Sequence, residues 1–215
     1  MSAALLPTLL LGVLLGMRHA TDADHVVAVT TIVTRQGRLR DALRIGALWG
    51  IGHTVTILLV GGAIILLHVV IPPRLGLSME FAVALMLIGL GAYNLFADGA
   101  PAPGTLTTVR PVLVGIVHGL AGSAAVALLV LATISDVRWG IGYLLLFGTG
   151  TIVGMMGITA TVAAPMAFSV ARFADLRRSL QLAAGTLSVT FGLFLAGHIA
   201  LVEGLFSSAP LWAPR

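Results

Sequence analysis

The sequence predicts an all-α integral membrane protein with six transmembrane helices, arranged as two inverted repeats of three helices. Three observations lead to this class: the composition, six long apolar runs, and a sequence match between the two halves of the chain. Hydrophobic residues make up 58% of the 215 residues and charged residues only 9%, whereas a soluble domain carries about 25% charged residues. We therefore expect one transmembrane domain, residues 1–215, in contact with the lipid bilayer, with repeat 1 at about 1–97 and repeat 2 at about 111–206.

The six apolar runs are long enough to cross a hydrocarbon core of about 30 Å, for which a helix needs roughly 17–25 residues. In chain order they cover residues of about 5–33, 42–70, 80–97, 111–134, 139–170 and 180–206. The first and fifth runs exceed one spanning length, which indicates a tilt, a break or a re-entrant piece. The segments between the runs contain turn-forming residues such as Pro72, Pro73, Gly99 and Gly104. None of these segments is large enough for a soluble domain.

The arginines predict how the runs are oriented. The chain has twelve arginines and no lysine. Eight arginines flank the first, third and fifth connections: Arg35, Arg38, Arg40, Arg44, Arg110, Arg172, Arg177 and Arg178. Three lie on the opposite side: Arg74, Arg138 and Arg215. Because cytoplasmic loops are enriched in positive charge, we expect a multi-pass protein of the inner (cytoplasmic) membrane with both termini outside. Since the arginines lie in short loops, the net charge of +4 does not indicate a nucleic-acid partner.

The two halves of the chain contain matching segments. Residues Gly16–Ala20 align with Gly115–Gly119 at an offset of 99, and Trp49–Thr54 align with Phe147–Ile152 at an offset of 98. Each half would hold three spans, an odd number, so the second half must insert upside down. Inverted repeats with polar sites at their interface are an architecture of secondary transporters.

Several absences limit the function. The chain has no cysteine, which excludes disulfides and thiolate metal ligands. It has no Gly-rich phosphate-binding loop with lysine and no His-Glu-x-x-His pattern, which argues against an ATPase or a zinc protease of that type. We expect no enzyme activity, no catalytic residue and no organic cofactor.

One stretch of eight residues in the first run is highly polar. It contains five ionisable side chains: Arg18, His19, Asp22, Asp24 and His25. Such groups are costly at membrane depth unless they face a cavity, a partner or a substrate. Two imidazoles and two carboxylates are suitable ligands for a divalent transition metal. The alternative interpretation is structural, with Arg18 paired to Asp22 at the i,i+4 spacing of a helix.

A continuous helix would divide these side chains between two faces. At 100° per residue, His19, Asp22 and His25 would share one face, whereas Asp24 would point away from them. A helix that is polar on two faces cannot turn either face to lipid, so the segment must be central or locally unwound.

Four further histidines lie in or near the other runs. By helical rise, His53 and His118 sit at a depth similar to that of His19, which makes both of them candidates for the same site. His68 and His198 lie closer to the ends of their runs, where a packing or interfacial role is expected.

The polar stretch carries a family resemblance. Residues Arg18–Val26, RHATDADHV, closely resemble the RHAxDADHI motif of the nickel/cobalt transporter family. The segment Gly52-His53-Thr54-Val55 is similar to the second motif of that family, with Thr54 where serine is usual. The resemblance implies that His19, Asp24, His25 and His53 recognise Ni²⁺ or Co²⁺ as the transported substrate.

The second half of the chain departs from the classical permeases. Residues 118–123, HGLAGS, and 147–151, FGTGT, lack the acidic side chains of the corresponding family motifs, and the chain has six expected spans rather than eight. It is therefore more similar to the compact UreH/HupE-type branch, which is associated with nickel supply to urease or hydrogenase. That resemblance implies a metallochaperone or a urease or hydrogenase maturation factor as a partner.

The leading hypothesis from the sequence is a secondary permease for Ni²⁺, or Co²⁺, that takes up metal for metalloenzyme maturation. His19, Asp24 and His25 would be the primary ligands, His53 and His118 would complete the site, and Asp22 with Arg18 would orient the motif. Metal capture should weaken as the pH falls, because binding needs neutral histidines. Three alternatives stay open: an exporter of metal or another small solute, a non-transporting accessory protein for nickel delivery, and a membrane-embedded metalloenzyme.

Overall fold

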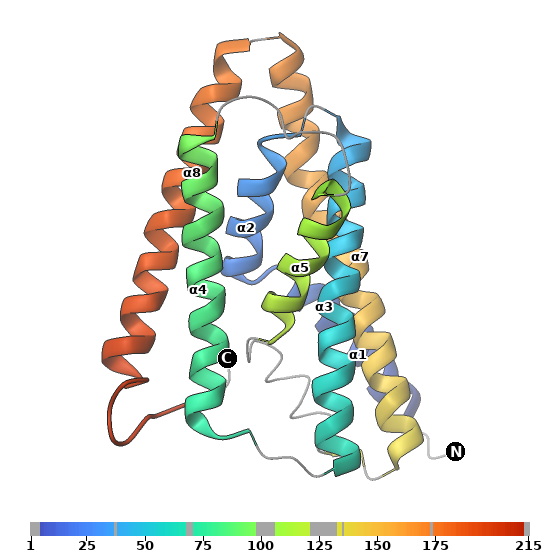
Figure 1. Ribbon diagram of the computed structural model, residues 1–215. Helices are drawn as coiled ribbons and strands as arrows, with labels where there is room; N and C mark the ends of the chain where they lie inside the picture. The colour runs from blue at the N-terminus through green and yellow to red at the C-terminus, as the bar shows by residue number, and fades with distance from the viewer. Residues whose placement is uncertain are drawn as a thin grey trace.

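The chain is built from helices that run roughly along one common direction (Figure 1). The computed structural model describes residues 5–36, 38–67, 71–97, 106–120, 133–134, 136–172 and 174–212. In chain order the helices are α1 (Leu5–His19), α2 (Ala23–Val33), α3 (Leu39–Leu67), α4 (Pro73–Phe96), α5 (Leu106–Leu120), α7 (Val137–Arg172), α8 (Ala174–Gly197) and a short π-helix, η2 (His198–Val202). The described residues contain no β-strand, so the expected all-α class is confirmed.

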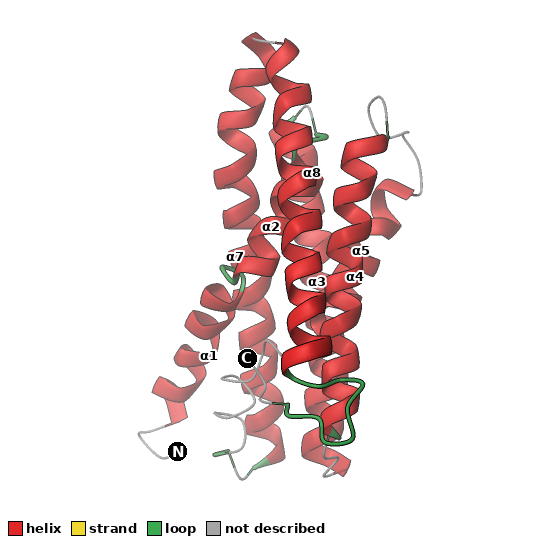
Figure 2. Cartoon of the chain, turned by 90° about the vertical axis from the view of Figure 1, so that its left-hand side faces the viewer, coloured by secondary structure: helices red, strands yellow, loops and turns green. Residues whose placement is uncertain are grey.

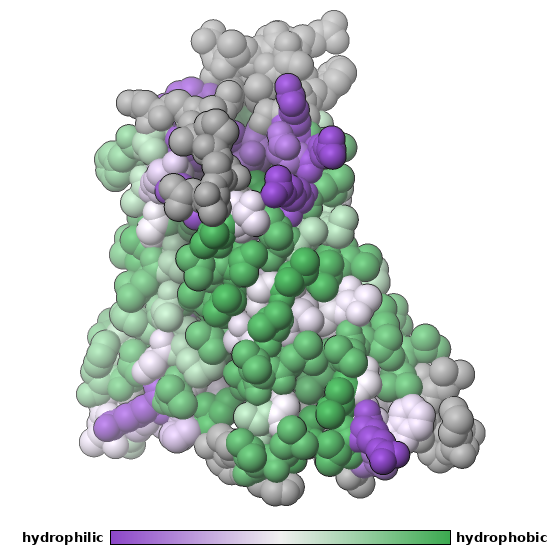
Figure 3. Space-filling model, turned by 45° about the vertical axis from the view of Figure 1, so that its right-hand side comes forward, coloured by the Kyte–Doolittle hydropathy of each residue, from purple (hydrophilic) through white to green (hydrophobic). Residues whose placement is uncertain are grey.

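Four of the helices are long and apolar enough to cross a membrane. They are α3, α4, the segment Val137–Met166 of α7, and the segment Arg178–Val202, which joins α8 to η2. Large apolar side chains point outward from them, among them Leu59, Leu85, Leu145 and Phe194, each at least half exposed. On the face in Figure 3, hydrophobic side chains form a broad band, and strongly hydrophilic ones gather toward its two ends. This surface is the one expected of a membrane protein.

The first and fourth expected spans differ from the prediction. The first run consists of two helices of 15 and 11 residues, α1 and α2. At 1.5 Å per residue each is shorter than a hydrocarbon core of about 30 Å. In the fourth run the structure describes α5 as far as Leu120, and residues 121–132 lie outside the described part of the chain. The described residues therefore contain four candidate spans and three shorter helices, where six full spans were expected.

The first run is broken at Ala20-Thr21-Asp22, inside the polar stretch (Figure 2). Thr21 folds back on the end of α1, because its backbone N–H and its hydroxyl both donate to the carbonyl oxygen of Arg18, at 2.8 and 2.6 Å. Asp22 has an extended backbone conformation and precedes α2 as its N-cap. Thr and Asp favour such positions because their side chains compete with backbone hydrogen bonds. The length of the first run predicted a tilt, a break or a re-entrant piece, and the structure shows a break.

Each main helix pair joins a helix from the first half of the chain to one from the second half. α1 packs along α7, α5 packs along α3, α3 packs against α7, and α4 packs against α8. Glycines permit close approaches: a Cβ at Gly16 would lie 2.1 Å from the carbonyl oxygen of Phe147, and a Cβ at Gly115 would lie 2.2 Å from that of Trp49. Small residues at helix contacts let backbones approach in this way.

The short helix α2 is enclosed by α4, α7 and α8. Its carboxyl end has carbonyl groups without partners in the helix, and side chains of neighbouring helices satisfy some of them. Asn94 of α4 donates its side-chain amide to the carbonyl oxygen of Thr31 and to the hydroxyl of Thr34, at 2.8 and 2.9 Å. Gln181 of α8 donates to the carbonyl oxygen of Thr34 at 3.4 Å. These bonds fix α2 in place and, with it, the polar stretch at its amino end.

The helix ends that flank the arginine-rich connections gather at one end of the molecule. The end of α2, the end of α4 and the end of α7 lie together in Figure 1, and the start of α1 and the end of α3 lie at the opposite end. The arginines that the sequence places on one side of a membrane therefore share one end of the fold. We refer to it below as the arginine-rich end.

Candidate metal centre

Four buried histidines meet in the interior of the helix bundle. His19 is the last residue of α1, His25 lies in the first turn of α2, His53 lies in the middle of α3, and His118 lies near the end of α5. His19 is 5% exposed, and the other three are fully buried. The break after His19 brings the end of one helix and the start of the next to the same point. We call this cluster, together with Asp22 and Asp24, the histidine centre.

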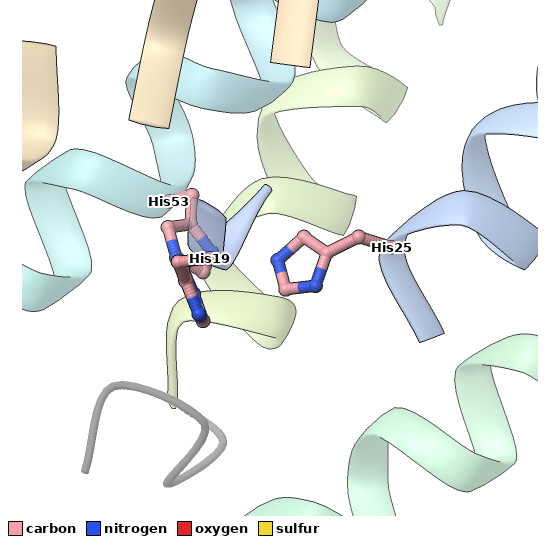
Figure 4. Close-up of side chains that lie close together, drawn as sticks. All are labelled: His19, His25 and His53. Atoms are coloured by element: carbon pink, nitrogen blue, oxygen red, sulfur yellow. The ribbon is translucent and has the colours of Figure 1, made fainter. Parts of the chain in front are cut away.

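Three of the imidazoles form a first group: His19, His25 and His53 (Figure 4). One nitrogen from each ring can be chosen so that all three atoms lie within 4.8 Å of one another. The Nε2 atoms of His19 and His53 are 3.0 Å apart. Metal–nitrogen bonds of about 2.0–2.1 Å place adjacent ligand atoms about 2.9–3.4 Å apart. The His19–His53 pair therefore already has the spacing of two neighbouring ligands on one ion.

Two carboxylates orient the rings of this group. The Nδ1–H of His19 donates to Oδ2 of Asp22 at 3.0 Å, and the Nδ1–H of His25 donates to Oδ1 of Asp24 at 3.0 Å. These bonds leave the lone pair of each ring on Nε2. The Nε2 atom of His25 is buried and has no hydrogen-bond partner among the described residues. Carboxylate–histidine pairs of this kind are the usual outer support of protein metal sites.

A second group shares one member with the first. It consists of Asp24, His25 and His118, and its candidate ligand atoms also lie within 4.8 Å of one another. The Nε2–H of His118 donates to Oδ2 of Asp24 at 2.9 Å, and the centroids of the His25 and His118 rings are 4.1 Å apart. The carboxylate of Asp24 thus joins His25 to His118. Both groups use only imidazole and carboxylate, a donor set that suits divalent transition metals.

An aromatic wall closes the centre on the side of α3. The Trp49 ring is stacked on His25 at an interplanar angle of 10° and a centroid distance of 6.1 Å, and it lies 5.4 Å from the His118 ring. Its indole nitrogen is buried without a hydrogen-bond partner in the described part of the chain. Phe147 of α7 lies 5.7 Å from the His19 ring. Trp49 is not among the site residues expected from the sequence, although Trp49 and Phe147 are the first residues of the segments that match at an offset of 98.

The structure brings together six of the seven residues selected from the sequence. Asp24 was expected to point away from the histidines, but that expectation assumed a continuous helix, and the break at residues 20–22 turns its carboxylate into the centre. Arg18 is exposed, and the described partner of Asp22 is His19 rather than Arg18. His198 lies outside the centre, where its ring contacts Glu203 at 3.4 Å. His68 lies outside the described residues.

The centre has the properties of a cation site. Burying a polar atom without a hydrogen bond is costly. Among the described residues, three imidazole nitrogens are buried in this state: Nε2 of His25, Nδ1 of His53 and Nδ1 of His118. The side chain of Asp22 is 38% exposed and that of Asp24 is 18% exposed, so the two carboxylates are the solvent-facing edge of the centre.

Comparison with known proteins finds one whole-length relative. The chain is 34% identical over 225 residues to a protein of Bacillus sp. (strain TB-90) described as urease accessory protein UreH, and the match covers 97% of each chain. No family model matches the sequence. No solved structure matches it either.

Proposed function

This chain belongs to the UreH family, and on that premise we propose that it is a membrane permease that carries Ni²⁺, or Co²⁺, through the histidine centre. Membership of this family confirms the resemblance to the UreH/HupE-type branch, which the second-half segments HGLAGS and FGTGT and the shorter chain predicted. The relative is named as an accessory protein of urease, and urease is the kind of metalloenzyme that the proposed uptake would supply. A metallochaperone or a urease or hydrogenase maturation factor would receive the metal.

The observation that carries this proposal is the first group of imidazoles. His19, His25 and His53 come from three helices, lie buried at the middle of the bundle, and hold two Nε2 atoms 3.0 Å apart. Two of the three rings are oriented by carboxylates, as in protein metal sites. Since the centre has no thiolate, nitrogen and oxygen donors would select Ni²⁺ or Co²⁺ over softer ions.

The pairing of helices supports an inverted repeat. The contact of Gly16 with Phe147 has a counterpart in the contact of Gly115 with Trp49, and the members of each pair correspond at offsets of 99 and 98. A second set of contacts obeys the same relation: Gly150 with Val13, and Gly52 with Val112. On this proposal the chain is one transmembrane domain of two halves, about 1–97 and about 111–206, and α1 with α2 forms one interrupted span.

The interrupted span favours transport over simple metal storage. Secondary transporters form their substrate sites near the bilayer midplane, where helices are broken and polar backbone groups are exposed to the substrate. α1 and α2 meet at the histidine centre in this manner. The arginine-rich end would face the cytoplasm and both termini would lie outside the inner membrane.

One alternative is favoured by the name of the relative, which describes an accessory protein and not a transporter. A non-transporting accessory protein would bind nickel in the same centre and pass it to a partner. The two functions differ in one measurable quantity, the flux of metal across a sealed membrane.

The deciding experiment is uptake of radiolabelled Ni²⁺ into proteoliposomes that contain the purified protein. We expect saturable uptake that is lost in His19→Ala and in His25→Ala and is competed by Co²⁺. His198→Ala serves as the matched control, because His198 is a histidine outside the centre. Wild-type protein that binds Ni²⁺ but moves none would support the accessory function, and wild-type protein that does neither would overturn the metal assignment.

A further inference from the structure

We propose that the histidine centre offers the metal two neighbouring positions that share His25, and that the ion moves from one position to the other during transport. The first position is formed by His19, His25 and His53, and the second by Asp24, His25 and His118. This inference rests on the proposed transport function. It adds an internal step to that function and assigns His118 to a different stage from His53.

The spacing of the side chains separates the two positions. The five side chains fall into two groups of three, each within 4.8 Å, and the groups overlap only in His25. The rings of His53 and His118 are 6.3 Å apart, whereas the ring of His25 lies 5.2 Å from His53 and 4.1 Å from His118. His25 is the side chain that can serve an ion in either place.

The hydrogen bonds differ between the two positions. In the first, the Nε2 atom of His25 has no hydrogen-bond partner among the described residues, and it faces the His19–His53 pair. In the second, the two carboxylate oxygens of Asp24 accept hydrogen bonds from His25 and His118. A metal can therefore enter the first position without breaking the bonds of Asp24. To enter the second, it must displace the hydrogen bonds that Asp24 accepts from His25 and His118.

The ligands that distinguish the two positions come from opposite ends of the molecule. α1, which ends at His19, starts at the end of the molecule opposite the arginine-rich end. α5, which contains His118, starts at the arginine-rich end (Figure 1). The two histidines also correspond in the sequence match, at an offset of 99. A carrier must expose its substrate to one side and then to the other. Two positions supported by helices from opposite ends meet that requirement.

The second position also carries more negative charge. The first group has three neutral imidazoles, whereas the second includes the carboxylate of Asp24. A divalent ion in a low-dielectric interior is stabilised by an opposite charge. The ion would thus pass from a position selected by imidazole geometry to one stabilised by charge.

The test compares equilibrium binding with flux in two variants. Ni²⁺ binding to purified protein and uptake into proteoliposomes are measured for His53→Ala and His118→Ala, with His198→Ala as the matched control. We expect His53→Ala to lose at least about 10-fold in Ni²⁺ affinity, because loss of a hydrogen-bond partner of a metal ligand already costs about 10- to 100-fold. We expect His118→Ala to lose much less affinity than His53→Ala, because the first position stays intact, and to lose uptake.

A spectroscopic measurement separates a ligand role from a structural one. Bound Co²⁺ should give the same visible absorption spectrum in His118→Ala as in the wild type, and a changed spectrum in His53→Ala. His118→Gln, which keeps a polar side chain, repeats the comparison if the alanine variant fails to fold. If a folded His118 variant loses as much Ni²⁺ affinity as His53→Ala, the centre is one site and the two-position proposal is overturned. Normal Ni²⁺ uptake by a folded His118 variant would overturn it as well. Absence of uptake by the wild type would instead overturn the transport function on which the two positions rest.

Discussion

The Nε2 atoms of His19 and His53 lie 3.0 Å apart, although 34 residues separate the two histidines in the chain. The Nδ1–H of His19 is bound to Asp22, so in neutral rings the Nε2 atom of His19 accepts a hydrogen bond from the Nε2–H of His53. A metal ion between them would replace that single bond with two coordinate bonds. This pair of side chains links α1 directly to α3 through a polar contact.

Loss of the outer carboxylate should weaken metal binding without removing a ligand. Asp22→Asn keeps the size of the side chain but removes the charge that orients His19. Removal of such a partner typically costs about 10- to 100-fold in metal affinity. Isothermal titration of Ni²⁺ into the purified variant measures the change. Arg18→Gln is the matched control, because Arg18 is exposed and Asp22 has His19 as its described partner; an equal loss in both variants would contradict the assignment.

Metal binding should depend on pH in one direction. A protonated histidine ring has no lone pair for a metal, so protons compete with Ni²⁺ for the ligands. The affinity for Ni²⁺ should therefore fall as the pH is lowered, and binding at low pH should release protons. Titrations at several pH values in buffers of different ionisation enthalpy measure both effects. A dissociation constant that does not change down to the lowest pH at which the protein stays folded would contradict histidine ligation.

Metal should stabilise the folded protein, and a chelator should reverse the effect. A ligand at a concentration 100 times its dissociation constant adds about 2.7 kcal/mol to the free energy of unfolding, which corresponds to a rise of roughly 5–10 °C in melting temperature for a chain of this size. Thermal unfolding in detergent with Ni²⁺ and then with excess EDTA measures it. The rise should vanish in His25→Ala, because both groups contain His25, and should persist in His198→Ala.

The close approach of α1 to α7 should tolerate no added methyl group. A Cβ at Gly16 would lie 2.1 Å from the carbonyl oxygen of Phe147, which is backbone and cannot move aside freely. Overpacking of this kind costs about 1–3 kcal/mol. Gly157→Ala is the matched control, since a Cβ at that position in α7 meets nothing within 4 Å. We expect a lower melting temperature for Gly16→Ala and an unchanged or slightly higher one for Gly157→Ala; equal stability of the two variants would contradict the tight contact.

Much of the fold and of the site follows from local sequence. The composition and the apolar runs predict an all-helical membrane protein, and the equal depth of His19, His53 and His118 predicts their convergence. The position of Asp24 could not be predicted in the same way, because a helical wheel assumes an unbroken helix. The break depends on Thr21 bonding back to α1 and on Asp22 bonding to His19. Trp49 was missed because its stacking on His25 is a tertiary contact between α3 and α2 that local sequence does not indicate.

The helix that stops at the histidine centre also imposes an electric field on it. α1 ends at His19, and the chain breaks at residues 20–22, so the carboxyl end of α1 lies at the centre. The carboxyl end of a helix has the equivalent of roughly half a negative charge. The positive amino end of α2 lies at the same place, but Asp22 and Asp24 occupy its cap and first turn and neutralise it. The carboxyl end of α1 is thus left to repel anions from the middle of the molecule and to attract a doubly charged cation before any side chain binds it.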